Sequence, residues 1–388
     1  MIESRRWLTT MALYFPRPPR SGDKERTMPE KTTEMALNAG IIDFTAKTNG
    51  RPYRLFISSP SGPAPDSGWP VIYLIDGNLH FGITVDTARI QARWPDVLDP
   101  VIVGIGYQTD SVSEALKLRM WDLTTPTTEA YINSDWLAKM PGEVGDFGGL
   151  DGYLDAIDAD IKPLIAAHYD IDQNDQTLIG HSLGGLTALH ALFRRTSSFQ
   201  HFVAISPSIW WDERAVLQHE AAFVARAAAG DVRARALISV GGEESSPRPM
   251  SKHVPFPMTE DDMLAMTRGC RMVENAVELG ERLARAAKPG FEVKTVVHAD
   301  DDHNMVPAAG IARGIFSQCA GRPNHVFPPR LRRTRDAPCA HLQSRTSASD
   351  GVVGQHDFHG PERGAGARGG AGRTQQHHPS PPERSEHR

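Results

Sequence analysis

The stretch Gly180-His181-Ser182-Leu183-Gly184-Gly185 decides which fold this chain is expected to adopt. Just before it, residues 177–179 form a short apolar run that predicts a buried strand, and after it apolar residues recur at helical spacing through residue 193. The glycines on either side of Ser182 permit a sharp turn between strand and helix, because side chains there would collide with both elements. The pattern therefore predicts a nucleophile elbow, a turn that exposes a serine hydroxyl for attack on a carbonyl group.

Similar apolar runs occur on both sides of this motif. Because they are apolar throughout and rich in β-branched residues, they are typical of parallel strands covered by helices on both faces. The predicted strands are residues 53–57, 71–75, 101–105, 177–179, 202–205, 237–240 and 293–297, and residues 154–165, 273–287 and 311–316 have helical spacing. This alternation predicts a doubly wound, mostly parallel α/β sheet, the α/β-hydrolase fold, with ligands bound at the carboxyl ends of the strands.

The chain has 388 residues, enough for one large α/β domain, and its two ends differ in composition from its middle. Residues 1–38 are mixed and polar, and residues 320–388 contain no Trp, Tyr, Ile, Met or Lys but many Arg, Gly, Pro and His. Such segments bury too little apolar surface to offset the entropy lost on ordering. We therefore predict a disordered leader (1–38), an α/β-hydrolase catalytic domain (39–319) and a disordered, low-complexity tail (320–388).

Charge, hydropathy and cysteine content argue against several classes of partner. The tail holds more Arg than acidic residues, so the folded body is more acidic than the formal net charge of −5 indicates, which argues against a nucleic-acid enzyme. No apolar stretch approaches the roughly 20 residues of a membrane helix, and the N-terminus lacks the pattern of a signal peptide. Three cysteines without metal-binding spacing suit a reducing compartment. We expect a cytoplasmic protein that binds neither membranes nor nucleic acids; the sequence carries no signal for the oligomeric state.

A serine at an elbow needs a base, which hydrolases of this fold take from a loop after the last strand. His303 lies in Asp300-Asp301-Asp302-His303-Asn304, directly after the strand predicted at 293–297. Its imidazole is expected to accept the Ser182 proton and to return it to the leaving group. His298 is the nearest alternative, but it lies at the end of that strand, where a packed or hydrogen-bonded role is expected.

The third catalytic group should be a carboxylate that orients the imidazole, and its natural place is the loop after residues 237–240. Gly241-Gly242-Glu243-Glu244 occupies that position, so Glu243 and Glu244 are both candidates. The aspartates at 300–302 lie so near His303 in sequence that reaching the far nitrogen of its ring would require an unusual turn. They are expected to tune the local potential instead.

Two backbone N–H groups should stabilise the oxyanion of the tetrahedral intermediate. We expect them from Leu183, which follows the serine, and from Asn78, in the loop after the strand predicted at 71–75. Residues 107–149, rich in Thr, Pro and Gly, interrupt the alternation of strands and helices and are predicted to form a substrate-facing loop. No set of residues has the spacing of a complete metal site, so neither a metal nor a cofactor is expected.

Four segments together resemble one known family. Ile75-Asp76-Gly77-Asn78, the elbow hexapeptide, Ser206-Pro207-Ser208-Ile209-Trp210-Trp211 and Asp302-His303-Asn304 are similar to the esterase family of α/β-hydrolases that includes esterase D and the enterobactin and salmochelin siderophore esterases. The likeness covers about residues 40–317 and implies that Ser182 is the nucleophile and His303 the base.

The resemblance also implies roles for residues that spacing alone leaves open. The Gly-Gly-Glu-Glu segment is similar to the family's Gly-x-x-Glu loop, which favours Glu244 over Glu243. Arg119-Met120-Trp121-Asp122-Leu123-Thr124 resembles an element that borders the family's active site. Arg119 is therefore expected either to contact an anionic substrate, such as a catecholate siderophore, or to pair with Asp122. Trp210 is expected to contact the substrate.

These expectations converge on a carboxylic ester hydrolase that works through an acyl-enzyme on Ser182, without a cofactor, on a small-molecule ester such as a siderophore. Three alternatives stay open at this point, because the fold does not choose among them. They are a thioester hydrolase similar to S-formylglutathione hydrolase, an acyltransferase, and a non-catalytic binding protein of the same fold.

Overall fold

The computed structural model describes residues 39–94, 97–138, 146–246 and 259–319. All of them belong to one compact unit of the chain. The leader predicted at 1–38 and the tail predicted at 320–388 lie outside the described residues. None of the helices in the described part of the chain is both long and apolar enough to cross a membrane.

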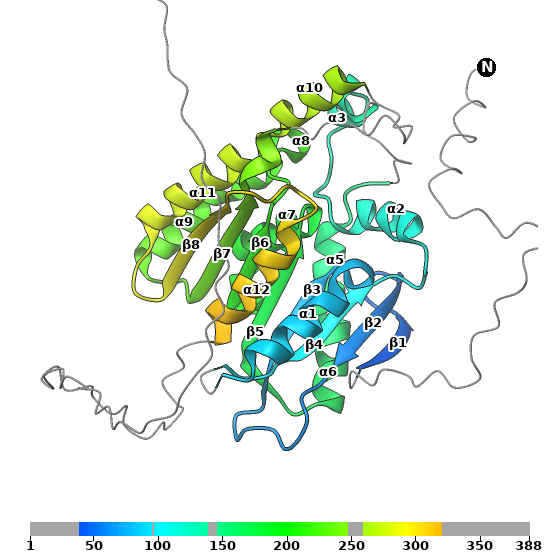
Figure 1. The fold of residues 1–388 in the computed structure, drawn as a ribbon, viewed down its shortest axis with the longest axis vertical. Helices are drawn as coiled ribbons and strands as arrows, with labels where there is room; N and C mark the ends of the chain where they lie inside the picture. The colour runs from blue at the N-terminus through cyan, green and yellow to red at the C-terminus, as the bar shows by residue number, and fades with distance from the viewer. Residues whose placement is uncertain (1–38, 95–96, 139–145, 247–258, 320–388) are drawn as a thin grey trace, which may run out of the picture. The chain divides into compact units, whose positions relative to one another are not determined.

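The described residues form one eight-stranded sheet in the order β1-β2-β4-β3-β5-β6-β7-β8 (Figure 1). The strands β1 and β2 pair antiparallel with their neighbours. The other six strands, β3 to β8, run parallel to one another. This arrangement confirms the predicted mostly parallel sheet. The strands are β1 (Ala39–Thr45), β2 (Pro52–Ser58), β3 (Trp69–Ile75), β4 (Val101–Gly106), β5 (Ile171–His181), β6 (His201–Ile205), β7 (Ala234–Gly241) and β8 (Phe291–His298).

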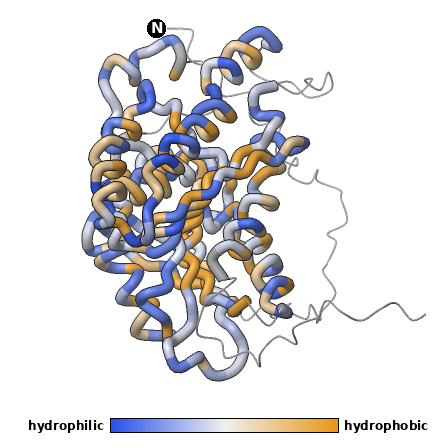
Figure 2. Tube along the Cα trace, turned by 90° about the vertical axis from the view of Figure 1, so that its left-hand side faces the viewer, coloured by the Kyte–Doolittle hydropathy of each residue, from blue (hydrophilic) through white to orange (hydrophobic). Residues whose placement is uncertain are grey.

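Burial explains which strands were predictable. The residues of β4 are all buried, as are those of β3 after Trp69, which is why both strands read as continuous apolar runs. The edge strand β1 was not predicted, because most of its residues are exposed and it carries no such run. Figure 2 shows hydrophobic residues gathered along the strands of the sheet.

Helices cover both faces of the sheet, as a doubly wound fold requires. On one face α1 (Gly77–Gln91) and α12 (Val306–Cys319) pack together and bury a smaller core. The opposite face carries the larger core. Its helices are α5 (Leu150–Ala156), a π-helical turn (Ile157–Ile161), α6 (Lys162–His168), α7 (Leu183–Arg194), α9 (Glu220–Ala229) and α11 (Met272–Ala286). The short helix α8 (Trp211–Arg214) precedes α9, and α10 (Glu260–Cys270) precedes α11.

The prediction of an irregular loop at 107–149 was partly wrong. This segment contains α2 (Val112–Asp122), α3 (Glu129–Ile132) and α4 (Asp135–Ala138), whereas residues 139–145 lie outside the described residues. Helix α2 begins at a local signal, since the Ser111 hydroxyl accepts a hydrogen bond of 3.3 Å from the Glu114 N–H. Polar and apolar residues are mixed on all sides of α2, so the helix lacks a clear apolar face.

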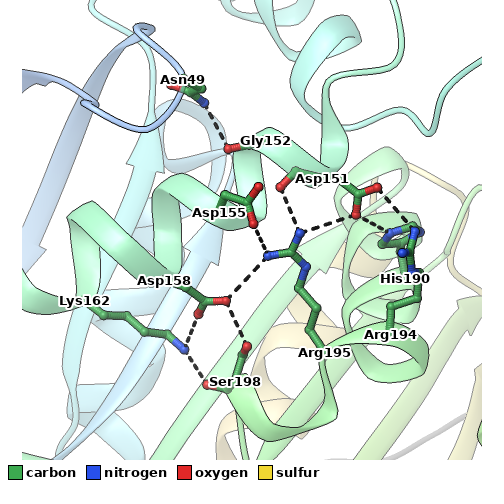
Figure 3. Close-up of polar contacts among 10 residues, drawn as sticks. All are labelled: Asn49, Asp151, Gly152, Asp155, Asp158, Lys162, His190, Arg194, Arg195 and Ser198. Carbon is green, nitrogen blue, oxygen red and sulfur yellow. Dashed lines mark hydrogen bonds and ion pairs between the residues drawn. The ribbon is translucent and has the colours of Figure 1, made fainter.

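A polar network holds α7, the helix that begins at the elbow, against α5 and the π-helical turn (Figure 3). Arg195 donates to the Asp155 carboxylate at 2.5 Å and to the Asp151 carbonyl at 3.2 Å. The Asp158 carboxylate pairs with Lys162 at 2.8 Å and accepts from the Ser198 hydroxyl at 2.9 Å. The carboxyl end of α7 is thus tied to neighbouring helices on the same face of the sheet, while its amino end follows the serine.

Candidate active site

Ser182 lies between β5 and α7 with φ 60° and ψ −118°, a backbone conformation that L-residues rarely adopt. The surrounding glycines make this turn possible. A Cβ atom on Gly180 would lie 2.1 Å from the Gly184 carbonyl oxygen, and one on Gly185 would lie 2.7 Å from the Ile205 carbonyl oxygen. The strained turn is held by a hydrogen bond of 2.9 Å from the Ser182 N–H to the same Ile205 oxygen. The geometry is that of a nucleophile elbow.

His303 lies in the turn between β8 and α12. Its Nδ1 is 2.7 Å from Glu244 Oε2, and its ring centroid is 4.5 Å from that of His181, the residue before the serine. The turn is fixed by Asp302, whose Oδ1 accepts backbone hydrogen bonds from Asn304 and Met305 at 3.0 Å each. The imidazole therefore has one nitrogen engaged by a carboxylate and lies beside the elbow.

Ser182 and His303 are not joined by a hydrogen bond among the described residues. The serine Oγ instead lies 3.4 Å from the Ser208 Oγ, and the Ser208 N–H donates to the Ser182 carbonyl at 3.1 Å. Rotation of the serine side chain about its Cα–Cβ bond changes which neighbour Oγ faces, and hydrogen bonds between catalytic groups often tighten only when substrate is bound.

The structure separates the two acidic candidates. Glu244 is buried, and its Oε1 accepts hydrogen bonds from the Gly241 N–H at 2.7 Å and from the Ser206 hydroxyl, which leaves Oε2 facing His303. Glu243 is exposed, and its backbone N–H donates to the Asp301 carbonyl at 3.0 Å. Only Glu244 has the geometry of a group that orients the imidazole.

His298, the alternative base, has the hydrogen-bonded role expected at the end of the last strand. His298 ends β8, and its Nε2 lies 2.9 Å from the Ser239 hydroxyl on β7. Burial lowers the pKa of His298. Its partner is thus a structural hydroxyl in the neighbouring strand and not the serine at the elbow.

Two helix amino ends meet at the carboxyl edge of the adjacent strands β3 and β5. Leu183 is the first residue of α7, and Gly77 and Asn78 are the first two of α1, so their N–H groups have no acceptor inside their own helices. The Asn78 side chain is fully engaged: its Oδ1 accepts from the Tyr107 N–H at 2.7 Å, and its Nδ2 donates to the Tyr107 and Thr109 carbonyls at 3.0 Å. Only its backbone can act as an oxyanion donor.

Arg119 has a different partner from either of those expected. Its Nε and Nη2 donate to the two carboxylate oxygens of Asp76 at 2.8 and 2.7 Å, and Nη2 also lies 3.4 Å from the His181 carbonyl oxygen. Burial opposes its charge, but Asp76 outweighs burial and raises the pKa of Arg119. Asp122 pairs instead with Arg51 at 2.9 Å. The expected pair between Arg119 and Asp122 is therefore wrong, and the buried guanidinium instead contacts the backbone of His181, the residue before the serine.

Trp210 follows the last residue of the Ser-Pro-Ser segment by two positions and is partly buried against the larger core. Its ring lies 5.8 Å from that of Trp211, which is fully buried and donates its Nε1–H to the Thr127 hydroxyl at 3.2 Å. Trp211 thus connects the segment after β6 with the segment after α2.

Sequence reasoning missed several contacts at the site. Asp76, Ser206 and Ser208 were quoted as parts of motifs without assigned contacts, and His181 was seen only as a variable position of the elbow. Burial, reinforced by neighbouring His303, His80 and Arg119, lowers the pKa of His181 well below its usual value. The position of these residues at or just after strand ends was the one local signal for them. Their partners could not be predicted, because they are distant in sequence. No group of three or more potential metal ligands occurs among the described residues.

The strand order, the strained serine and the His–Glu pair after the last two strands define the α/β-hydrolase class. The model of the Putative esterase family matches residues 46–256. The chain is 33% identical to the ferri-bacillibactin esterase BesA of Bacillus subtilis, over 75% of this chain and 95% of that protein. It is 30% identical to the siderophore triacetylfusarinine C esterase of Aspergillus fumigatus, over 74% of this chain and 96% of that protein.

The solved structures agree with these relatives. The siderophore hydrolase EstA from Aspergillus nidulans has a TM-score of 0.61 at 29% identity and covers 73% of this chain and 95% of its own. The BES protein from Bacillus cereus has a TM-score of 0.60 at 27% identity and covers 76% of this chain and 100% of its own. The chain belongs to the Putative esterase family and is a serine ester hydrolase, which confirms the class and family expected from the motifs.

Proposed function

We propose that Ser182, His303 and Glu244 form the catalytic triad of this esterase. The observation that carries the proposal is the 2.7 Å contact between His303 Nδ1 and Glu244 Oε2, with the imidazole ring lying against the residue before the serine. A buried carboxylate on Nδ1 leaves Nε2 as the nitrogen that accepts a proton, which is the tautomer a general base requires.

The reaction follows from this geometry. Ser182 Oγ attacks the ester carbonyl carbon while His303 Nε2 takes its proton, and the resulting oxyanion is stabilised by the N–H groups of Leu183 and Asn78. Collapse of the intermediate breaks the bond to the alcohol oxygen, which receives the proton from His303, and leaves an acyl group on Ser182. Water, deprotonated by the same imidazole, then releases the acid and restores the serine.

We propose that the substrates are siderophore esters. This rests on the relatives, whose names describe esterases that act on ferri-bacillibactin, triacetylfusarinine C and enterobactin. Trp210, two residues after Ser208, whose hydroxyl lies 3.4 Å from the Ser182 Oγ, is proposed to contact the substrate. Arg119 is not proposed as a direct ligand of an anionic substrate, because Asp76 engages its Nε and Nη2 in a buried pair.

The decisive experiment compares wild type and Ser182→Ala on three ester classes: a cyclic trilactone siderophore in ferric and iron-free form, p-nitrophenyl acetate, and S-formylglutathione. We expect hydrolysis that depends on Ser182, with kcat/KM highest for the siderophore. Equal rates for the two proteins contradict the enzymatic role of Ser182, and a higher kcat/KM for the thioester overturns the assignment of substrate. Transfer of the acyl group to an added alcohol in preference to water favours an acyltransferase.

We also propose that residues 39–319 form the catalytic domain and that the protein is cytoplasmic. The second proposal is supported by the low cysteine content, three cysteines in 388 residues, as suits a reducing compartment. Removal of residues 320–388 should leave kcat unchanged, and cell fractionation should recover the protein with cytoplasmic markers. Loss of kcat on truncation contradicts the proposed domain boundary.

A further inference from the structure

The segment Ser206-Pro207-Ser208 contacts both the acid and the nucleophile of the proposed triad. Ser206 follows β6 directly and is completely buried, and its hydroxyl donates a hydrogen bond to Glu244 Oε1. Ser208 is buried as well, and its hydroxyl lies 3.4 Å from the Ser182 Oγ. Neither serine has a role in the reaction described above.

The backbone of Ser206 adopts a conformation that is costly for any residue other than glycine. Its φ is 41°, in the left-handed region, and its N–H donates to the Ser239 carbonyl at 2.6 Å, which fixes the residue between β6 and β7. Glycine would adopt this φ without strain. A serine that is kept in a strained and fully buried position indicates that its hydroxyl is used.

We propose that Ser206 is a positioning residue for the triad, and that its hydroxyl holds the Glu244 carboxylate so that Oε2 faces His303. The proposal rests on the proposed function, in which Glu244 is the acid. A buried carboxylate has several lone pairs to satisfy, and the donors around it decide how it is rotated.

The donors found around Glu244 support this role. Oε1 takes two of them, the Ser206 hydroxyl and the Gly241 N–H at 2.7 Å, so the imidazole is the donor to Oε2. Among the described residues, His303 is the one basic side chain within ion-pair distance of Glu244. The other titratable neighbour is Cys270, whose pKa is raised to about 12 by burial and by the Glu244 charge, so the thiol stays neutral. The Glu244 carboxylate is therefore oriented by hydrogen bonds from neutral groups.

The test uses Ser206→Ala and Ser206→Gly, with Ser208→Ala as the matched control in the same segment. Both variants remove the hydroxyl, but glycine also relieves the left-handed strain, so Ser206→Gly should lower the unfolding temperature less than Ser206→Ala does. We expect both Ser206 variants to lower kcat by about 10- to 100-fold, with KM changed less than about threefold, as for loss of one hydrogen bond to a charged group.

A double-mutant cycle separates positioning of Glu244 from any other effect on the site. In a Glu244→Gln background, removal of the Ser206 hydroxyl should cost little further kcat, whereas the loss from Ser208→Ala should add to that of Glu244→Gln. The low-field proton NMR signal of the His303 Nδ1–H should broaden or shift in Ser206→Gly and persist in Ser208→Ala.

A wild-type kcat in Ser206→Gly, or losses that add fully with Glu244→Gln, overturns the positioning role. Failure of the proposed function would look different. In that case wild type shows no hydrolysis that depends on Ser182, or Glu244→Gln is as active as wild type, and no Ser206 measurement is needed to see it.

Discussion

Two of the histidine–carboxylate pairs, one beside the elbow and one that includes His190 of the elbow helix α7, are buried in opposite ways. In the pair His303–Glu244 the imidazole is 38% exposed and the carboxylate 1%. In the pair His190–Asp151 the imidazole is 1% exposed and the carboxylate 39%, with a distance of 3.0 Å between His190 Nε2 and Asp151 Oδ1. The same two chemical groups are thus arranged once with the acid inside and once with the base inside.

The difference determines what each pair can do. A buried acid with an accessible imidazole can pass a proton to a substrate, because the charged partner stays fixed while the ring faces the reaction. A buried imidazole cannot exchange protons with a substrate, and Asp151 is also shared with Arg194 and Arg195 at 3.3 and 3.5 Å (Figure 3). We therefore interpret His190–Asp151 as a structural pair that fastens α7 to α5.

The largest expected effect comes from removing each imidazole. His303→Ala should lower kcat by about 10⁴- to 10⁶-fold and change the free energy of unfolding little, because the ring is partly exposed. His190→Ala should do the reverse and cost about 2–4 kcal/mol of stability, since it opens a cavity at a buried hydrogen-bonded site. Kinetics on folded protein and urea unfolding of both variants check this, and a large loss of kcat in folded His190→Ala would contradict the comparison.

Substitution of the two carboxylates should show the same contrast, with smaller effects: loss of kcat for Glu244 and loss of stability for Asp151. Glu244→Gln should lower kcat by about 10²- to 10⁴-fold, because the amide no longer stabilises the imidazolium. Asp151→Asn should leave kcat within about twofold and cost about 1 kcal/mol of stability, as expected for a partly exposed pair. Each variant is the control for the other, because both replace one carboxylate oxygen by an amide nitrogen. Equal losses of kcat in the two variants would show that burial does not distinguish the pairs.

The buried imidazole should also make stability depend on pH. Burial lowers the pKa of His190, opposed by Asp151 and reinforced by His219 and Arg194. A group whose folded pKa lies below its unfolded value of about 6.5 contributes stability that is complete above pH 6.5 and is lost as the pH falls through the folded pKa. Wild type should therefore lose more stability between pH 7.5 and 5.5 than His190→Gln, measured by urea unfolding. A steeper loss in the variant would reverse the assigned direction.

The smallest expected effect concerns the arginine that joins the structural pair to its neighbours. Arg195 pairs with Asp155 at 2.5 Å, but the Asp155 side chain is 50% exposed. Solvent screens such a pair, so Arg195→Ala should cost about 0.5–1 kcal/mol and leave kcat unchanged. Addition of 0.5 M NaCl should reduce the difference from wild type, as expected for a screened interaction. A loss as large as that of His190→Ala would mean that the ion pairs, and not the buried ring, fasten α7.

Much of the fold was predictable because its signals are local. The apolar runs of β3 and β4 reflect burial on both faces, and Gly180 reflects a collision with the backbone of Gly184, which is near it in sequence. Helix α2 and strand β1 were missed because neither has a continuous apolar run or a clear apolar face. Apolar patterns in the sequence report burial, so elements with few buried apolar residues, such as these two, leave little trace in them.

The site was predictable to the level of chain order. Ser182, Glu244 and His303 each follow a strand at the same edge of the sheet, so an order of serine, acid and base predicted their meeting. The partner of Arg119 was not predictable, because Asp76 lies 43 residues away on a different strand end and Asp122 was the acid near it in sequence. The hydroxyl of Ser206 on Glu244 was missed for the same reason, across 38 residues.

By itself, the sequence determined where strands end, where a serine is forced into a sharp turn, and which family the motifs resemble. These follow from sterics and burial within short stretches of chain. Only the tertiary structure decided which carboxylate receives Arg119, which histidine–carboxylate pair lies beside the elbow, and, where spacing had left two candidates, which glutamate meets His303. Those contacts depend on strand order and on burial from several elements at once, and neither is encoded in any one segment.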